Sequence, residues 1–207
     1  MVNYIHPTAI IHPTALLGRN NYIGPFCIIG PNVKIADNNH FESHCSIGAP
    51  PEHRDFWKTS YQSVNIGSNN MFREFVTVHS GTSCDTIIMN NVVMLTKSHV
   101  GHDAFIEDNV NISCFACVGG HSIILKGANL GLHSVIHQNC VVGHYSMIGM
   151  GCIVTKKSLI LPCSTYVGNP ARKLKLNDYA IKKHHITGEM VYEYEMDFQQ
   201  ALRELHD

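Results

Sequence analysis

Residues 88–124 read IMNNVVMLTKSHVGHDAFIEDNVNISCFACVGGHSII, and every sixth residue of this stretch is large and apolar. These anchors are Ile88, Met94, Val100, Ile106, Ile112, Val118 and Ile124. The same step runs back to Ile5 and on to Ile160, with two interruptions. A helix repeats its apolar face about every 3.6 residues, and a strand repeats it at every second residue. A period of six therefore predicts a short strand followed by a corner, repeated along the chain.

Small or β-branched residues follow the anchors at a second fixed distance. Four residues after each anchor from Ile88 onward stand Val92, Ser98, Ala104, Val110, Ala116, Ser122, Ala128, Ser134, Cys140, Ser146 and Cys152. Three such strands close a triangular coil, in which the large residue fills the interior and the small one fits the corner. The pattern resembles the hexapeptide-repeat β-helix, so we expect an all-β, left-handed parallel β-helix of about eight coils over residues 1–165. The left hand follows from the resemblance, because ordinary crossover connections are right-handed.

Two segments interrupt the repeat, and another follows it. We predict loops that project from the prism at residues 49–65 and 79–87, and loops on a rigid scaffold commonly carry function. Pro162, Gly168 and Pro170 predict a turn-rich exit, so residues 166–207 form the coil exit and a C-terminal helical tail. In this tail apolar residues recur at helical spacing from Glu189 onward, with Thr187 as the N-cap. The helix is expected to cover the open end of the solenoid.

The composition narrows the class of function. Of the 207 residues, 44% are apolar and 15% are charged, and the net charge is -1 with histidine neutral. A sizeable core can be buried, and the clustered basic residues typical of a nucleic-acid partner are missing. The sequence has no apolar run long enough to span a bilayer and begins with MVNYIHPTAI, which does not resemble an export signal. We therefore expect a cytoplasmic protein that is not integral to a membrane, with its eight cysteines reduced.

Polar residues stack at one corner of the predicted coils. Residues one coil apart lie above each other, so GHD at 101–103, GGH at 119–121 and HQN at 137–139 share a corner on successive coils about 4.8 Å apart. His99 lies close by on the first of these coils. Ionisable side chains beside glycines can supply a general base and an oxyanion donor. Exposed corners are polar by default, however, and with 15 histidines in the chain some stacking is expected by chance.

Several motifs resemble the UDP-N-acetylglucosamine acyltransferase family of lipid A biosynthesis, over roughly residues 4–183. They include IHPTA at 5–9, IGPFCIIGPNV at 23–33, FREFVTVHSGT at 72–82, SHVGHD at 98–103 and GGH at 119–121. The resemblance implies acyl transfer from a thioester, without a metal or another cofactor. It also implies that His102 is the general base, that Asp103 orients or balances it, and that the Gly120 N–H is the oxyanion donor.

The resemblance further implies the residues that bind the substrates. They are Asp55, Lys58, His99 and His121 for the sugar, His137 and Gln138 for the substrate or the pantetheine arm, and Asn177 and Lys183 for the nucleotide. In the family the site lies between the subunits of a homotrimer. Met150 stands at the position that limits the length of the acyl chain, so short or medium acyl groups are expected, since a filled groove cannot bury further methylenes.

Some alternatives stay open. The donor is either an acyl carrier protein thioester or an acyl-coenzyme A, because GNPAR at 168–172 resembles a segment of acetyl-coenzyme A-dependent acetyltransferases. The acceptor is UDP-N-acetylglucosamine or another UDP- or dTDP-linked sugar. A γ-class carbonic anhydrase shares this fold and binds zinc, but it would need a His-x4-His pair, whereas His99 and His102 are three residues apart. A non-catalytic scaffold is a further alternative, because a fold does not fix a function.

Overall fold

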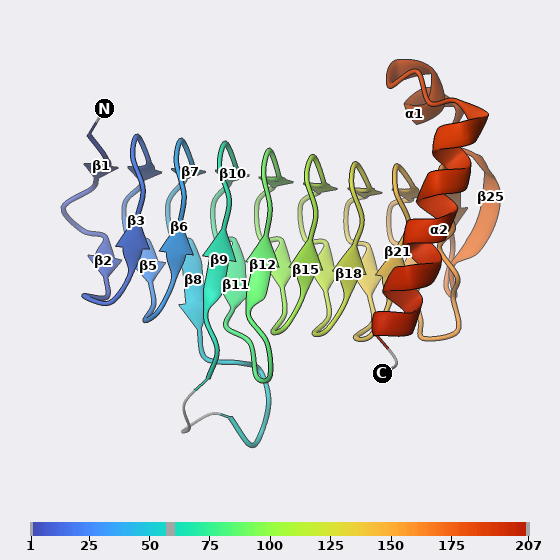
Figure 1. The fold of residues 1–207 in the computed structure, drawn as a ribbon. Helices are drawn as coiled ribbons and strands as arrows, with labels where there is room; N and C mark the ends of the chain where they lie inside the picture. The colour runs from blue at the N-terminus through green and yellow to red at the C-terminus, as the bar shows by residue number, and fades with distance from the viewer. Residues whose placement is uncertain (1, 57–60, 206–207) are drawn as a thin grey trace.

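The computed structural model describes residues 2–56 and 61–205, which form one elongated prism (Figure 1). The coils stack in chain order from the N-terminus toward the C-terminus. Among the described residues, strands in neighbouring coils pair in parallel, and only the last pair, β24 with β25, is antiparallel. This architecture is the parallel β-helix that the period of six predicts.

Three sheets, named A, B and C here, make the faces of the prism. Sheet A contains β1 (Tyr4–Ile5), β4 (Tyr22–Ile23), β7 (His40–Phe41), β10 (Met71–Phe72), β13 (Val93–Met94), β16 (Asn111–Ile112), β19 (Asn129–Leu130), β22 (Met147–Ile148), β24 (Ser164–Val167) and β25 (Arg172–Leu176). Sheet B contains β2 (Ile10–Ile11), β5 (Ile28–Ile29), β8 (Ser46–Ala49), β11 (Thr77–His79), β14 (His99–Val100), β17 (Cys117–Val118), β20 (Val135–Ile136) and β23 (Ile153–Val154). Sheet C contains β3 (Leu16–Leu17), β6 (Lys34–Ile35), β9 (Val64–Ile66), β12 (Thr86–Ile88), β15 (Phe105–Ile106), β18 (Ile123–Ile124) and β21 (Val141–Val142).

The predicted anchors form the core of the prism. Every anchor from Ile23 to Ile160 is buried, and so is the second track of small residues. Phe41 and Phe72 stack inside the prism with their ring centroids 4.4 Å apart. Burying a side chain of this size contributes about 1.5–3 kcal/mol. Ile5 is 44% exposed, since the first coil has a neighbour on one side only.

Both interruptions leave the prism at the same corner. The first runs over residues 50–63 between β8 and β9, and the second over residues 80–85 between β11 and β12. The strands therefore extend into the ends of the predicted loops, because backbone pairing continues to Ala49 and His79 and resumes at Val64 and Thr86. Each interruption connects sheet B with sheet C, so the loops project together from one edge (Figure 1).

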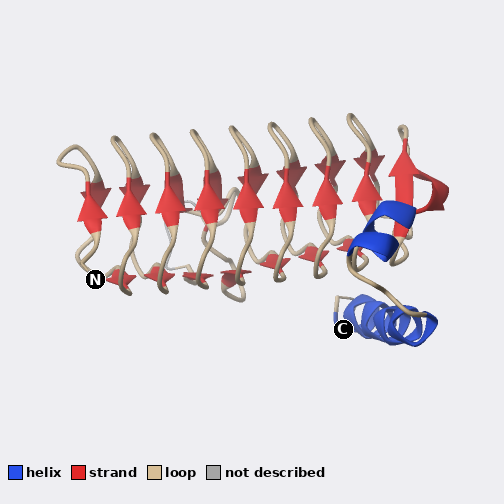
Figure 2. Cartoon of the chain, turned by 90° about the horizontal axis from the view of Figure 1, so that it is seen from above, coloured by secondary structure: helices blue, strands red, loops and turns tan. Residues whose placement is uncertain are grey.

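The C-terminal tail packs against the last coils. The predicted helix is α2 (Gly188–Glu204), and the Thr187 hydroxyl caps it by accepting a hydrogen bond from Met190 N. A shorter helix, α1 (Asp178–Lys183), and the antiparallel strand β25 were not predicted. Phe198 of α2 is fully buried among Leu125 and Val141, so α2 lies along sheet C rather than only over the end of the prism. Figure 2 shows both helices at the C-terminal end.

The helices in the described part of the chain are too short or too polar to cross a membrane.

Candidate active site

Three successive coils bring the predicted columns together at the corner between sheets B and C. His99 pairs with Cys117 and Cys117 with Val135, so β14, β17 and β20 are in register one above the other. In the turns that follow, His121 N donates to the His102 carbonyl at 2.9 Å, and Asn139 N donates to the Gly120 carbonyl at 3.0 Å. The stacking expected from residues one coil apart is therefore confirmed.

His102 and Asp103 form a tight pair at this corner. The distance from His102 Nδ1 to Asp103 Oδ2 is 2.6 Å, and the Asp103 side chain is fully buried. Asp103 adopts a φ of 59°, the left-handed conformation that turns its side chain beside the preceding imidazole. Because an ionised carboxylate can only accept, Nδ1 carries the proton and Nε2 is left as the basic nitrogen.

The second loop wraps around the same carboxylate. Asp103 Oδ2 accepts from Thr82 N at 2.8 Å, and Oδ1 accepts from Ser83 N at 2.7 Å and Cys84 N at 2.8 Å. The hydroxyls of Thr82 and Ser83 donate to it as well. Burial alone would raise the pKa of Asp103, but the hydrogen bonds from His102 and from these backbone amides hold that pKa far below its usual range. Asp103 is thus a fixed anion behind His102.

Gly120 lies directly against the His102 ring on the next coil. A Cβ on Gly120 would lie 2.7 Å from His102 Cε1 and 2.8 Å from Nε2, so a side chain at this position would displace the imidazole. A Cβ on Gly101 would similarly lie 2.8 Å from Gly120 N. Among the described residues no acceptor receives the Gly120 N–H. The absence of side chains at both glycines therefore lets the His102 ring pack against Gly120, whose backbone N–H has no backbone acceptor in the described part of the chain.

Further histidines surround the pair. His121 Nε2 lies 3.6 Å from Asp103 Oδ2, and its ring meets His102 edge-on at 5.1 Å. His99 Nδ1 is 2.8 Å from the Thr77 hydroxyl. Burial lowers the pKa of His99, and the neighbouring His102 and His79 act in the same direction against the opposing charge of Glu52. His99 is therefore neutral at cellular pH.

The first loop contributes residues that the sequence reasoning missed. The His53 ring meets the His102 ring edge-on, with centroids 6.0 Å apart. Glu52 Oε2 lies 3.3 Å from His99 Nε2, and Glu52 Oε1 lies 3.7 Å from His79 Nε2. Counting the six-residue repeats along the sequence could have found them. Both interruptions follow a sheet-B strand, so both loops begin at the histidine corner.

Other predicted binding residues are spread over the molecule. Asp55 is exposed, with its carboxylate 3.9 Å from His53 Nδ1, and Lys58 lies outside the described residues. His137 and Gln138 are exposed at the same corner, two coils beyond Gly101 and His102. Their roles stay predictions.

Three predicted residues lie away from this corner. Asn177 caps α1 through Ala180 N, and its side-chain amide donates to the Tyr145 carbonyl. Lys183 lines a cavity with Asn109 and Lys126 at the corner between sheets C and A. Met150 is 74% exposed and follows β22, at the corner between sheets A and B. Within one chain these residues therefore do not meet His102.

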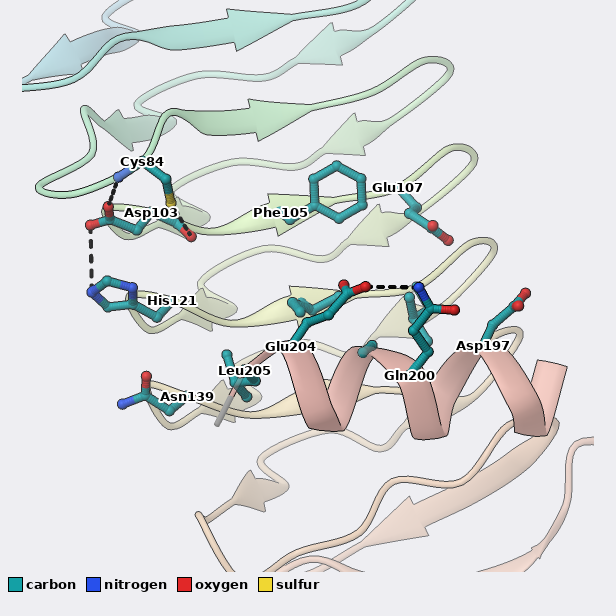
Figure 3. Close-up of a pocket in the computed structure, with 13 residues that line it drawn as sticks. Cys84, Asp103, Phe105, Glu107, His121, Asn139, Asp197, Gln200, Glu204 and Leu205 are labelled. Atoms are coloured by element: carbon teal, nitrogen blue, oxygen red, sulfur yellow. Dashed lines mark hydrogen bonds and ion pairs between the residues drawn. The ribbon is translucent and has the colours of Figure 1, made fainter. Parts of the chain in front are cut away.

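A cavity of about 650 Å³ extends from the histidine corner along sheet C to α2 (Figure 3). Asp103, His121 and Asn139 lie at one end, and Glu107 and Asp197 lie at the other. Its middle is lined by apolar side chains, namely Phe105, Ile123, Leu125, Ala201 and Leu205.

Known proteins resemble this chain in sequence and in fold. Residues 14–49 match the bacterial transferase hexapeptide (six repeats) family. The acyl-(acyl-carrier-protein)-UDP-N-acetylglucosamine O-acyltransferase of Gloeothece citriformis is 30% identical over 161 residues, which cover 72% of this chain and 58% of the relative. The same enzyme of Synechocystis is 29% identical over 154 residues, which cover 69% of this chain and 55% of the relative. The chain thus spans just over half the length of these curated relatives.

Superposition on solved structures covers a larger share of this chain and of the similar protein. A UDP-N-acetylglucosamine acyltransferase from Bacteroides fragilis superposes with a TM-score of 0.78 at 29% identity, covering 98% of this chain and 90% of that one. The Francisella novicida enzyme gives a TM-score of 0.77 at 28% identity, and the superposition covers 93% of this chain and 77% of that one. A coil of opposite hand could not superpose to this extent, so the left-handed β-helix implied by the resemblance is confirmed. The chain is a hexapeptide-repeat protein similar to UDP-N-acetylglucosamine acyltransferases.

Proposed function

Starting from this similarity, we propose that the chain is an acyltransferase that moves an acyl group from a thioester to a hydroxyl or amine of a nucleotide-activated sugar. The observation that carries the proposal is the arrangement of three groups at one corner. The Asp103 carboxylate fixes the His102 tautomer, and the His102 ring packs against Gly120, whose backbone N–H has no backbone acceptor among the described residues. A base next to an oxyanion donor is what acyl transfer requires.

Each of these groups has a defined role in the reaction. The acceptor O–H or N–H gives its proton to His102 Nε2 as its oxygen or nitrogen attacks the thioester carbonyl carbon. The carbonyl oxygen becomes an oxyanion, which the Gly120 N–H stabilises. The intermediate then collapses, the C–S bond breaks, and the leaving thiolate takes the proton back from His102. Asp103 stays ionised throughout and stabilises the transient imidazolium, as its lowered pKa supports.

The remaining corner residues hold the acceptor and the pantetheine arm. His121 faces the cavity and is well placed to contact the sugar. His99, His137 and Gln138 extend the same corner along the prism axis and complete the binding surface. The acceptor is a UDP-N-acetylglucosamine-like sugar and the donor an acyl carrier protein or coenzyme A thioester; the acyl carrier protein relatives favour the former donor. All eight cysteines are free, which supports a reaction in the cytoplasm.

The complete site forms between neighbouring copies of the chain in a homotrimer, with residues from two chains. Met150, Lys183 and His102 lie at three different corners, so a neighbouring prism must supply the missing parts. A closed three-fold ring of prisms places unlike corners against each other. In this homotrimer Lys183 and Asn177 bind the nucleotide, and Met150 limits the acyl chain.

The test is a thioester-release assay. The purified chain is incubated with acyl carrier protein and coenzyme A thioesters and with a panel of UDP- and dTDP-sugars, and free thiol and acylated sugar are measured together. The proposal predicts release of one thiol for each acylated sugar, and only with a nucleotide sugar. Thiol release without a sugar product, or no release with any sugar, would contradict it.

A further inference from the structure

Three side chains with metal-binding atoms converge just outside the catalytic pair. One ring nitrogen of His79, one ring nitrogen of His99 and a carboxylate oxygen of Glu52 all lie within 4.8 Å of one another. His79 and His99 stand on neighbouring strands, β11 and β14, whereas Glu52 comes from the first loop. The function proposed above makes no use of this cluster as a unit.

Both imidazoles are oriented by their other nitrogen. His79 Nδ1 is 2.8 Å from the Pro50 carbonyl, which can only accept, so Nδ1 donates and Nε2 carries a lone pair. His99 Nδ1 is 2.8 Å from the Thr77 hydroxyl, which accepts from Nδ1 in the tautomer that leaves a lone pair on Nε2. Histidines that ligate metals typically donate the second ring N–H to a carbonyl or another acceptor. This outer arrangement is therefore already in place.

The spacing of the three atoms fits an ion better than direct hydrogen bonds. Glu52 Oε2 lies 3.3 Å from His99 Nε2, and Glu52 Oε1 lies 3.7 Å from His79 Nε2. Charge-assisted hydrogen bonds are shorter, at about 2.7–2.9 Å. Ligands at about 2.0–2.1 Å from a tetrahedral zinc ion are about 3.3 Å apart. When both Nε2 atoms carry lone pairs, the three side chains present acceptors to one another, and a cation between them would satisfy all three.

The geometry points to a divalent-metal site of the zinc class formed by Glu52, His79 and His99. Two imidazoles and one carboxylate are a common zinc ligand set, with the fourth position left for water. The ion fastens the first loop to the prism through Glu52, next to His53, whose ring touches His102. Metal binding would thereby hold that loop over the catalytic corner.

A second set of donors, His102, Asp103 and His121, is also close enough for an ion. Its atoms are already engaged, because His102 Nδ1 donates to Asp103 and both Asp103 oxygens accept backbone amides. The Asp103 side chain is also fully buried, whereas Glu52 is 60% exposed and leaves a path for an ion. Mutation therefore distinguishes the two sets. Replacing Glu52, His79 or His99 should weaken metal binding if the ion lies in the first set, whereas replacing His121 should weaken it if the ion lies in the second.

The test is metal binding by the untagged full chain after chelation and dialysis. Zinc is titrated in competition with a chromophoric chelator, and cobalt is titrated with its visible absorption as a measure of tetrahedral ligation. We expect one ion per chain. Glu52→Gln, His79→Gln and His99→Gln should each weaken zinc by more than the about 10–100-fold that loss of an outer partner costs, and Thr77→Val should fall within that range.

The matched controls are His40→Gln and Glu42→Gln, which disrupt a His–Glu pair with a 3.1 Å contact outside this cluster. They should bind zinc as wild type does. Zinc should also slow trypsin cleavage after the exposed Arg54 in wild type and not in His99→Gln. No stoichiometric binding, unchanged affinity in the three ligand variants, or loss of binding in His121→Gln instead would overturn the inference. Because these readouts do not use acyl transfer, they stand apart from the proposed function.

Discussion

At the scale of single residues, Asp103 both orients His102 and gathers the amides of the second loop. An asparagine keeps only one acceptor oxygen and cannot balance an imidazolium. Asp103→Asn should therefore lower kcat by about 10²–10⁴-fold. It should also reduce the free energy of unfolding by about 1–3 kcal/mol, because a buried amide loses its partner. Steady-state kinetics and urea unfolding measure the two effects.

The matched control is Asp108→Asn. Asp108 Oδ1 also accepts a backbone amide, from Asn90 N at 2.8 Å, but it lies on the turn that follows sheet C. This variant should lose some stability and keep its kcat. Wild-type kcat in Asp103→Asn would show that His102 does not depend on this carboxylate.

Gly120 offers a second test at the residue scale. Gly120→Ala places a methyl group 2.8 Å from His102 Nε2, so the ring must move away from the free N–H. A displaced base and a blocked oxyanion donor should reduce kcat by about 10²–10³-fold, the usual cost of losing such a donor. Gly188→Ala, which meets nothing within 4 Å, is the control and should leave kcat unchanged. Equal kcat in both variants would exclude Gly120 from the site.

At the scale of elements, the sequence predicts the features that its six-residue period determines. Inward residues must recur with the coil, so the anchors and the stacked corner could be predicted, and the separate helical spacing from Glu189 onward predicts α2 with its Thr187 cap. Strand β25 and helix α1 lie after the repeat ends, where no period constrains them. The contacts of Glu52 and the five hydrogen bonds that the second loop donates to the Asp103 carboxylate depend on how irregular loops fold back, and local sequence does not encode that path.

The contact between α2 and the prism is sensitive to acid. His144 is buried against Tyr194, near Glu107 and Asp197, and burial lowers its pKa to about 4. The unfolded chain binds this proton near pH 6.5, so between about pH 6.5 and 4 it holds more protons than the folded chain. The free energy of unfolding should therefore fall as the pH drops through this window, by on the order of 3 kcal/mol.

Urea unfolding at a series of pH values measures this slope. His144→Phe keeps the stacking on Tyr194 but cannot take up a proton, so the slope should flatten. His133→Phe is the control, because His133 is exposed and stacks on Phe115. If wild type and His144→Phe lose stability in parallel, the acid sensitivity arises elsewhere.

At the scale of the whole molecule, the proposed site needs three prisms. Light scattering should therefore give about three times the 23.0 kDa mass of one chain. The exposed Met150 would then lie in the acyl groove of a neighbouring copy, where each further methylene gains about 0.8 kcal/mol only if space remains. Wild type should prefer short or medium donors, up to about ten carbons if each added methylene must find room. Met150→Gly should shift that preference to longer ones.

A ladder of acyl donors compared by kcat/KM measures the shift. Leu132→Gly is the control, since Leu132 stands one coil earlier at the same corner and is also exposed. An unchanged profile in Met150→Gly, or a monomer in solution, would remove Met150 as the limit on chain length.

The most direct test of the account is acyl transfer by His102→Ala, measured by kcat/KM with the donor and nucleotide sugar on which wild type is most active. The account predicts a loss of about 10²–10⁴-fold, because the proton of the acceptor no longer has a base. The circular dichroism should match that of wild type, since His102 lies at a corner outside the hydrophobic core. Turnover close to wild type in a folded His102→Ala protein would contradict the central claim.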